Sequence, residues 1–385
     1  MRLLEILEFS KEYLKKYSFS KPRLESEKVI SHILGIKRIE LYSNFEMELE
    51  SGEKDKIKIF LREMARKRKT FDEIIKEKEN SFEEKQEEKS SEKKSSEKKS
   101  FKDENINLLS KSIQYLKKYN VENARLDAEY IFAYVLGVKR ISLMLNFDEE
   151  ISEENKNLIR QYIVRRGKYR EPLQYIVKEW EFYGYPIKVD GRVLIPRQDT
   201  EILVEQCIFL MKEKENPKIL DIGTGSGAIS IALAKELPES EVLGLDVSDD
   251  ALKMAVENRE LNNVSNLKFL KSDVFQHVRE KNYDLIVSNP PYIPVEEYNE
   301  LMPEVKKYEP RMALTDGGDG YYFYKKISEE SVNYLKNGGY LAFEVGYTQG
   351  ETVSQLMEKN GFQIIGRVAD YGGIERVIIG RKEEK

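Results

Sequence analysis

The stretch of sequence that decides the fold lies in the second half of the chain and reads Asp221-Ile222-Gly223-Thr224-Gly225-Ser226-Gly227-Ala228. It follows a short apolar run and precedes a helical pattern, so we expect it to be the turn between a strand and a helix. Glycines allow a tight turn and close approach of a ligand to the backbone, because no Cβ intervenes. The stretch therefore predicts an α/β fold with a ligand site at this turn.

Strand-like and helix-like stretches alternate from residue 218 onward. The short apolar runs that read as strands are 219–220, 242–245, 267–270, 284–287, 340–343 and 377–379. Helical stretches such as 251–261 separate them, which indicates βαβ units. We expect a Rossmann-like, mainly parallel sheet with helices on both faces and with ligands at the carboxyl ends of its strands.

Composition excludes several classes of protein. The chain has 385 residues, enough for two or three domains, and a net charge of −5. We expect no membrane segment, because no run of about 20 apolar residues occurs. The single cysteine, Cys207, cannot form an intramolecular disulfide, and with only His32 and His277 beside it no Cys/His zinc site is expected. These features favour a cytoplasmic protein without a metal.

One sequence unit occurs twice ahead of the sheet. Residues 13–17 recur as 115–119, a shift of 102 positions (115 − 13), and residues 34–39 match 136–141 at the same shift. The apolar spacing within each copy is helical, and we expect Gly35 and Gly137 to end helices. The repeat predicts two small all-α bundles, one a duplicate of the other.

Four segments follow from these patterns. We expect a helical copy at 1–78, a charged low-complexity linker at 79–104, a second helical copy at 105–178 and an α/β catalytic domain at 179–385. The linker has almost no apolar side chains to offset the entropy of ordering, so we expect disorder, although its Glu–Lys pairs also allow a helix. Basic residues predominate in the helical copies and acidic residues in 171–385.

Two aspartates at later strand ends are candidates for binding a nucleoside. Asp246 is placed to accept hydrogen bonds from both ribose hydroxyls, with a helix N-cap as the alternative. Asp273 could accept from an adenine amino group while Val274 packs on the ring, with a turn aspartate as the alternative. Gly223, Gly225 and Ala228 also fit the dinucleotide pattern, so NAD is a competing ligand.

The loop Asn289-Pro290-Pro291-Tyr292 follows a buried strand. Two prolines hold the loop rigid with outward carbonyls, because their φ is fixed and they lack an amide hydrogen. Asn289 offers an amide, and Tyr292 offers an aromatic wall and a hydroxyl. The loop therefore suits a substrate NH₂ group, which would donate to the Asn289 side chain and the Pro290 carbonyl.

The glycine stretch, with Asp221 ahead of alternating glycines, resembles the signature of S-adenosylmethionine-dependent methyltransferases. More closely, the chain from about 106 to 380 resembles the release-factor glutamine methyltransferases, the HemK/PrmC group. The segments that carry this resemblance are 170–176, 193–201, 221–228, 289–293, 309–311 and 317–320. The additional copy at 1–78 and its linker are not explained by it.

The resemblance implies transfer of a methyl group from S-adenosylmethionine to the N5 amide nitrogen of the glutamine in the Gly-Gly-Gln motif of peptide chain release factors, with the second helical copy recognising the factor. The implied cofactor-binding residues are Gly223, Thr224, Gly225, Ser226, Gly227, Asp246, Asp273, Val274 and Asn289. The implied catalytic residues are Asn289, Pro290 and Tyr292, and the implied substrate-binding residues are Asn289, Pro290, Pro291 and Tyr292. Arg197 is open between a place near the cofactor and a place bracing the domain junction.

Three other functions remain open. The same tetrapeptide suits an exocyclic base amine of DNA or RNA, although the acidic residues of 171–385 disfavour duplex DNA. A ribosomal-protein glutamine is a second alternative, and a non-catalytic binding module is a third. The basic helical copies could contact the ribosome or RNA. The first copy is either an accessory docking module or a retained duplication without a role.

Overall fold

The computed structural model describes residues 3–36, 38, 41, 47–49, 51–77, 92–370 and 372–383. The chain divides into two compact units, Met1–Glu97 and Lys98–Lys385. The first contains the first helical copy. The second contains the other helical copy and the sheet, and it carries the candidate site.

The first unit is a helical bundle that closes on itself. Its helices are α1 (Leu3–Lys16), α2 (Pro22–Leu34), α3 (Ser51–Lys67) and residues 71–77. α2 ends as expected at Gly35, whose φ of +66° is left-handed and whose N–H bonds to Ser31 O. The helix at 71–77 packs against α2. Phe71 N donates to Glu25 Oε2 over 2.7 Å, and Ile74 is fully buried.

The expected linker differs from the structure in part. Helix α5 (Glu92–Lys118) begins inside it, so disorder is wrong for residues 92–104, while residues 78–91 lie outside the described part. Glu and Lys are good helix formers and support a helix when spaced four apart. Tertiary contacts also hold α5, since Asn105 Nδ2 donates to Phe147 O at 3.0 Å and Glu149 O at 2.8 Å. The prediction of disorder from composition took too little account of helix propensity and could not include the tertiary contacts.

The second helical copy is the bundle that leads into the sheet. Beside α5 it contains α6 (Ala124–Val135), η2 (Arg140–Asp148), α7 (Glu153–Gly167) and α8 (Leu173–Val177). Its core includes Leu116, Phe132 and Ile159. Gly137 (φ +64°) follows α6 and turns the chain, as expected.

The membrane test concerns two of these helices. In the described residues, no single helix is both long and apolar enough to cross a membrane; α6 and η2, bent by 67°, meet the criterion only as a pair. Both contribute buried side chains to the core of the bundle, among them Ile131 and Phe147.

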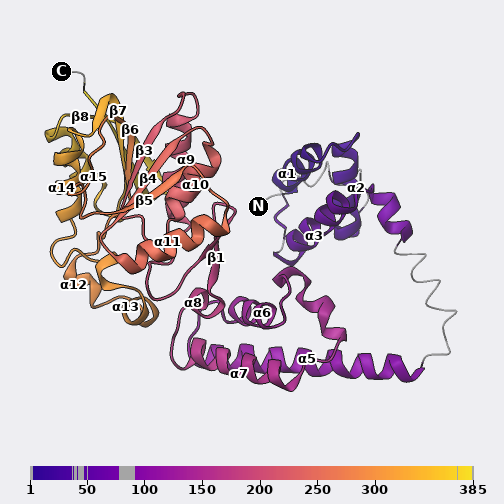
Figure 1. Ribbon diagram of the computed structural model, residues 1–385. Helices are drawn as coiled ribbons and strands as arrows, with labels where there is room; N and C mark the ends of the chain where they lie inside the picture. The colour runs from indigo at the N-terminus through magenta and orange to yellow at the C-terminus, as the bar shows by residue number, and fades with distance from the viewer. Residues whose placement is uncertain are drawn as a thin grey trace. The chain divides into compact units, whose positions relative to one another are not determined.

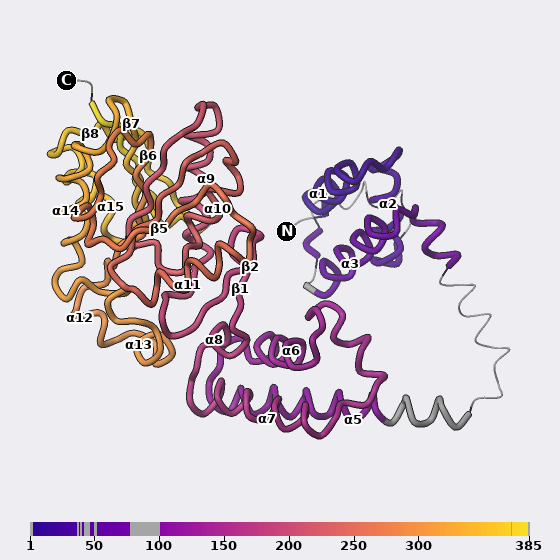
Figure 2. Tube along the Cα trace, in the orientation of Figure 1, coloured from indigo at the N-terminus to yellow at the C-terminus, as the bar shows by residue number. Residues whose placement is uncertain are grey.

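A hairpin that the sequence patterns did not indicate joins the bundle to the sheet. Strands β1 (Glu179–Phe182) and β2 (Tyr185–Lys188) pair antiparallel, with Trp180 opposite Ile187. The Cα trace in Figure 2 runs from α8 through this hairpin toward α9 (Asp199–Met211).

The main sheet has seven strands in the order β5-β4-β3-β6-β7-β9-β8. They are β3 (Lys218–Ile222), β4 (Glu241–Asp246), β5 (Leu267–Lys271), β6 (Tyr283–Ser288), β7 (Leu335–Glu344), β8 (Phe362–Ala369) and β9 (Glu375–Lys382). Of these seven strands, β9 alone runs opposite to the other six, which confirms a mainly parallel sheet. Strand order reverses between β3 and β6, so the glycine turn and the tetrapeptide lie side by side.

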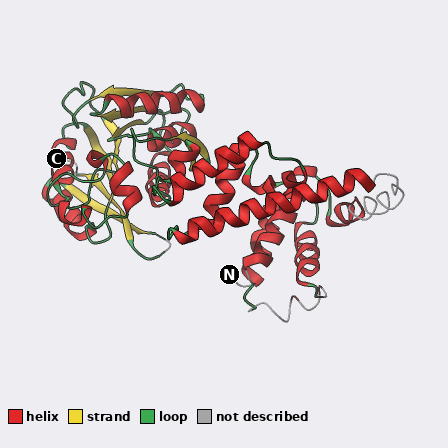
Figure 3. Ribbon diagram, turned by 90° about the horizontal axis from the view of Figure 1, so that it is seen from below, coloured by secondary structure: helices red, strands yellow, loops and turns green. Residues whose placement is uncertain are grey.

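Helices cover both faces of the sheet (Figure 1). One face carries α9, α10 (Ala228–Glu236) and α11 (Asp249–Leu261), and the other carries α14 (Tyr322–Ser331) and α15 (Gly350–Lys359). The connection from β6 to α14 contains α12 (Val295–Tyr298), α13 (Pro303–Tyr308) and η3 (Arg311–Ala313). In Figure 3 the strands, in yellow, lie between red helices near the C-terminus.

Candidate functional site

The glycine turn leads from β3 into α10. Gly223, Gly225 and Gly227 have φ values of +74°, +55° and +82°, which favour glycine. A Cβ at Gly227 would lie 3.2 Å from Ala255 Cβ, so this glycine allows α10 and α11 to pack closely. At Gly223 and Gly225 a Cβ would meet no heavy atom of the described residues within 4 Å. These two glycines therefore leave space beside the backbone for a ligand.

Asp246 ends β4 beside this turn. Its Oδ2 accepts a hydrogen bond from Gly225 N, and its Oδ1 accepts one from Ser248 N, both at 2.9 Å. Burial raises its pKa. The N-cap of α11 is Ser248, whose Oγ accepts from Ala251 N, so the N-cap alternative for Asp246 is wrong. The carboxylate instead lines a cavity at the ends of the strands.

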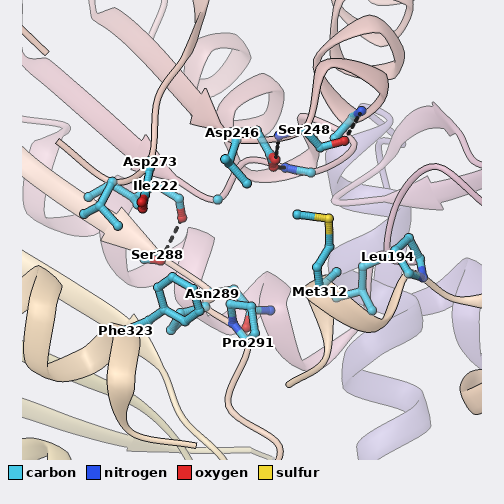
Figure 4. A pocket seen from close by; sticks show the side chains of 18 of the residues that line it. Leu194, Ile222, Asp246, Ser248, Asp273, Ser288, Asn289, Pro291, Met312 and Phe323 are labelled. Atoms are coloured by element: carbon cyan, nitrogen blue, oxygen red, sulfur yellow. Dashed lines mark hydrogen bonds between the residues drawn. The ribbon is translucent and has the colours of Figure 1, made fainter. Parts of the chain in front are cut away.

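This first cavity has a volume of about 330 Å³. Figure 4 shows Asp246 and Ser248 on one side of it, Asn289 and Pro291 on the opposite side, and Met312 between them. Further lining residues come from the segment between β2 and α9, from the ends of β3, β5 and β6, from the connection to α14 and from α14 itself: Leu194, Ile222, Gly223, Gly225, Asp273, Val274, Ser288, Pro290, Ala313 and Phe323.

Most of the expected cofactor residues meet here, but three do not. Within the described residues, the lining includes neither Thr224, Ser226 nor Gly227. The Thr224 hydroxyl donates to Asp221 Oδ2 at 2.7 Å, and Ser226 O accepts from Asn258 Nδ2 at 2.9 Å. These residues hold the turn from within, because their polar atoms bond to the protein.

The segment after β5 lines the cavity with an unusual backbone conformation, and two side chains from elsewhere add apolar lining. Val274 has a φ of +51°, unusual for a β-branched residue, and Ser272 Oγ donates to its carbonyl at 2.8 Å. Asp273 forms an ion pair with Lys326 at 3.0 Å. Phe323, in α14, and Met312, in η3, add apolar lining that sequence reasoning missed, because neither residue belongs to a segment next to a strand end.

The tetrapeptide after β6 separates the first cavity from a second. Pro291 lines the first cavity and Tyr292 the second, whereas Asn289 and Pro290 line both. The second cavity has a volume of about 720 Å³, and its walls come from the second helical copy and from the sheet domain. An amide held at Asn289 from the second cavity would therefore face the first.

Charged residues join the walls of the second cavity. Arg170 donates to Glu304 Oε1 at 2.7 Å and to the carbonyls of Tyr119 at 2.9 Å and Asn120 at 2.8 Å, so it ties the helical copy to α13. Arg197 pairs with buried Glu309 at 2.6 Å. Of the two readings of Arg197, the structure favours the brace, since it lines the second cavity.

Glu344, at the end of β7, is a residue of this wall that sequence reasoning missed. It is 2% exposed, and burial raises its pKa to about 7. Tyr292 Oη donates to Glu344 Oε1 at 3.3 Å. The pKa of Tyr292 is raised by its own burial and by this carboxylate. No group of three His, Cys, Asp or Glu able to hold a metal occurs among the described residues.

The first cavity fits S-adenosylmethionine. The ribose would lie against Asp246, the adenine between Val274 and Phe323, and the backbone at Gly223 and Gly225 leaves room for the rest of the molecule. Beside it, a rigid loop presents Asn289 and the Pro290 carbonyl to a separate cavity. This sheet and this pair of cavities are those of an S-adenosylmethionine-dependent methyltransferase.

Comparisons with known proteins show to which family of methyltransferases the chain is similar. The family model "Methyltransferase small domain" matches residues 198–319. The model "PrmC N-terminal domain" matches both 5–68 and 107–177, which confirms the duplication. A release factor glutamine methyltransferase of Fusobacterium nucleatum is 51% identical over 357 residues, 92% of this chain and 95% of that protein. One of Geobacter sulfurreducens is 42% identical over 267 residues, 69% of this chain and 93% of that protein.

The chain therefore belongs to the release factor glutamine methyltransferase family. The Fusobacterium relative also shares sequence within residues 1–104, since a match over 92% of the chain must extend into them. Among solved structures, a release factor-specific protein-(glutamine-N5) methyltransferase of Alicyclobacillus acidocaldarius covers 49% of this chain and 95% of its own, with 29% identity and a TM-score of 0.32.

Proposed function

We propose that this protein methylates the glutamine of the Gly-Gly-Gln motif in peptide chain release factors, at the N5 amide nitrogen. The observation that carries the proposal is the wall shared by the two cavities. Asn289 and Pro290 line both, as do Leu194 and Ala313, so a side chain that enters the second cavity as far as the tetrapeptide lies next to the first cavity. Family membership supports the same substrate class.

S-adenosylmethionine supplies an electrophilic methyl group when it is bound. Asp246 would accept from the ribose hydroxyls and Asp273 from the adenine amino group, with Val274 and Phe323 on the faces of the ring. The sulfonium already carries the positive charge that activates its methyl group. The protein therefore has only to position the donor.

The substrate amide is oriented by acceptors. Its NH₂ would donate to Asn289 Oδ1 and to the Pro290 carbonyl, with the ring of Tyr292 as a packing wall. An amide nitrogen is a weak nucleophile because its lone pair is conjugated, so orientation must supply much of the rate; well-placed groups contribute about 7–11 kcal/mol. Methylation makes the nitrogen positively charged, and its proton then leaves without a strong base. A glutamate would present oxygens to oxygens and is excluded.

Recognition of the factor falls to the second helical copy, residues 105–178. The second cavity is lined by side chains of this copy, including Leu126 and Gln174, together with residues of the catalytic domain, 179–385. We place the enzyme in the cytoplasm, where release factors act. The basic residues of the two helical copies would contact ribosome or RNA by replacing counterions of the phosphates.

Mass spectrometry tests the substrate and the reaction together. A purified release factor is incubated with the enzyme and S-adenosylmethionine, and a gain of one methylene mass is expected on the Gly-Gly-Gln glutamine. DNA, RNA and ribosomal proteins are treated in parallel with labelled donor. Label in one of these and none in the release factor would contradict the proposal, and so would a failure of the protein to bind the donor in calorimetry.

A further inference from the structure

We propose that Thr200 and Glu344 are positioning residues, which hold the side-chain amide of Asn289 with its Oδ1 toward the substrate glutamine. This inference rests on the proposed function, because it assigns how the substrate-binding asparagine is oriented. It concerns two residues from different elements, α9 and β7, which no local sequence pattern joins.

Three side chains form a line behind the tetrapeptide. Asn289 Nδ2 donates to Thr200 Oγ1 at 3.2 Å, and Thr200 is 4% exposed. The Thr200 hydroxyl in turn lies close enough to the Glu344 carboxylate to lower its pKa. Glu344 Oε1 accepts from Tyr292 Oη, while Glu344 Oε2 is buried and has no hydrogen-bond partner in the described part of the chain.

The chemistry of Glu344, Thr200 and Asn289 decides which group donates and which accepts in each contact. An ionised carboxylate only accepts, so Thr200 must turn its single hydrogen toward Glu344. Its oxygen is then left as an acceptor, which the NH₂ of Asn289 satisfies. The amide is thereby held with Oδ1 on the side of the cavities, where the substrate NH₂ needs an acceptor. In the reverse orientation Asn289 Oδ1 would face the Thr200 oxygen, acceptor against acceptor, and Asn289 Nδ2 would face the substrate NH₂, donor against donor.

Protonated Glu344 would no longer fix the orientation of the Asn289 amide, because a carboxylic acid can donate a hydrogen bond to Thr200. The charged and titratable groups that face Glu344 are Tyr292, Tyr324 of α14, Asp199 at the start of α9 and Arg376 of β9. Burial, the largest cause, and Asp199 raise the pKa of Glu344, whereas Thr200, Tyr292 and Arg376 lower it, to a net value of about 7. Glu344 is ionised above this pKa, so kcat should rise as the pH increases through about 7.

The test compares steady-state methylation of a release factor by wild type, Glu344→Gln, Thr200→Val and Thr200→Ser. In Glu344→Gln the new NH₂ can donate to Thr200, whose hydroxyl then turns to Asn289 Oδ1. We expect kcat to fall about 100-fold in Glu344→Gln and Thr200→Val, the scale of a misplaced reactive group. KM for the factor should change little, because the loss concerns orientation of the amide in the transition state. Thr200→Ser, which keeps the hydroxyl, should recover most of the wild-type kcat.

The pH profile separates positioning from a structural effect. Wild-type kcat should rise with pH with a midpoint near the pKa of Glu344, and this rise should be absent in Glu344→Gln. Asp284→Asn is the matched control, because Asp284 is a buried carboxylate at the other end of β6 and contacts Lys214 and Lys336. Its kcat should equal that of wild type.

Two results would overturn the inference: wild-type kcat in Glu344→Gln, or an equal loss in Thr200→Ser and Thr200→Val. If wild type itself leaves the release factor unmethylated, the proposed function has failed instead. Thermal unfolding of each variant is measured beside the kinetics, and a pH rise that persists in Glu344→Gln also refutes the role of Glu344.

Discussion

Gln349 holds the backbone of Tyr292, donating from Nε2 to the Tyr292 carbonyl oxygen over 2.9 Å. The side chain is buried, and its Oε1 accepts from Gly346 N at 3.1 Å. Gln349→Leu should lower the free energy of unfolding by about 1–3 kcal/mol, because it leaves buried polar groups unpaired. It should also lower kcat, since the tetrapeptide loosens. Chemical denaturation and methylation kinetics check this, with exposed Gln355→Leu as the control; equal stability of the two variants would contradict it.

Two glycines with the same backbone angle allow a steric test of the tetrapeptide. Gly320 and Gly373 both have φ of +81°. A Cβ at Gly320 would lie 2.3 Å from Tyr292 O, whereas at Gly373 it would meet nothing in the described residues within 4 Å. Gly373→Ala should cost about 1–2 kcal/mol of stability through backbone strain alone. Gly320→Ala should cost more and should also lower kcat. Equal effects on stability and unchanged kcat in both variants would show that the close approach is unimportant.

Removal of the Asn289 side chain should stop the reaction and spare the donor site. Asn289→Ala takes away one preorganised acceptor, and such losses cost about 2.7–4 kcal/mol of transition-state stabilisation, or about 10²–10³ in kcat. The Kd for S-adenosylmethionine, measured by calorimetry, should change little, because Asp246, which would hold the ribose, lies on the other side of the cavity. Turnover close to that of wild type would refute the role of Asn289.

Asp246 should control donor affinity in a pH-dependent way. A hydrogen bond to a charged group contributes about 1.5–3 kcal/mol, so Asp246→Asn should weaken binding about 10–100-fold. Burial raises the pKa of Asp246, so lowering the pH protonates it earlier than an exposed aspartate. The wild-type Kd should therefore rise as pH falls, and this rise should be missing in Asp246→Asn. Calorimetry over a pH series measures both, and exposed Asp250→Asn should behave as wild type.

Deletion of residues 1–97 should raise KM for the release factor and leave kcat unchanged. This cut follows the boundary between the two units and keeps the Asn105 contacts of α5. A tethered second module raises the local concentration of a bound partner, which affects capture and not chemistry. Deletion of residues 1–77 alone, which keeps the linker, should give the same increase. An unchanged KM in both deletions would favour a retained duplication without a docking role.

The glycine turn and the tetrapeptide could be predicted from the sequence because each is a continuous segment next to a strand end. The duplication was equally visible, since its evidence is the sequence itself. Residues whose role depends on pairing between distant strands could not be predicted: Glu344 reaches Tyr292 only because β7 pairs with β6. Thr224 and Ser226 lie outside the lining of the first cavity for a related reason, since the motif gives their order but not which way their polar atoms point.

The wall formed by Asn289 and Pro290 is thin, because both residues belong to two cavities at once. A single small molecule that joins an adenosyl group to a glutaminyl chain by a short tether would reach across it and occupy both chambers together. Such a bisubstrate inhibitor would compete with donor and acceptor alike, and its tightest-binding tether length would report how far the methyl group travels.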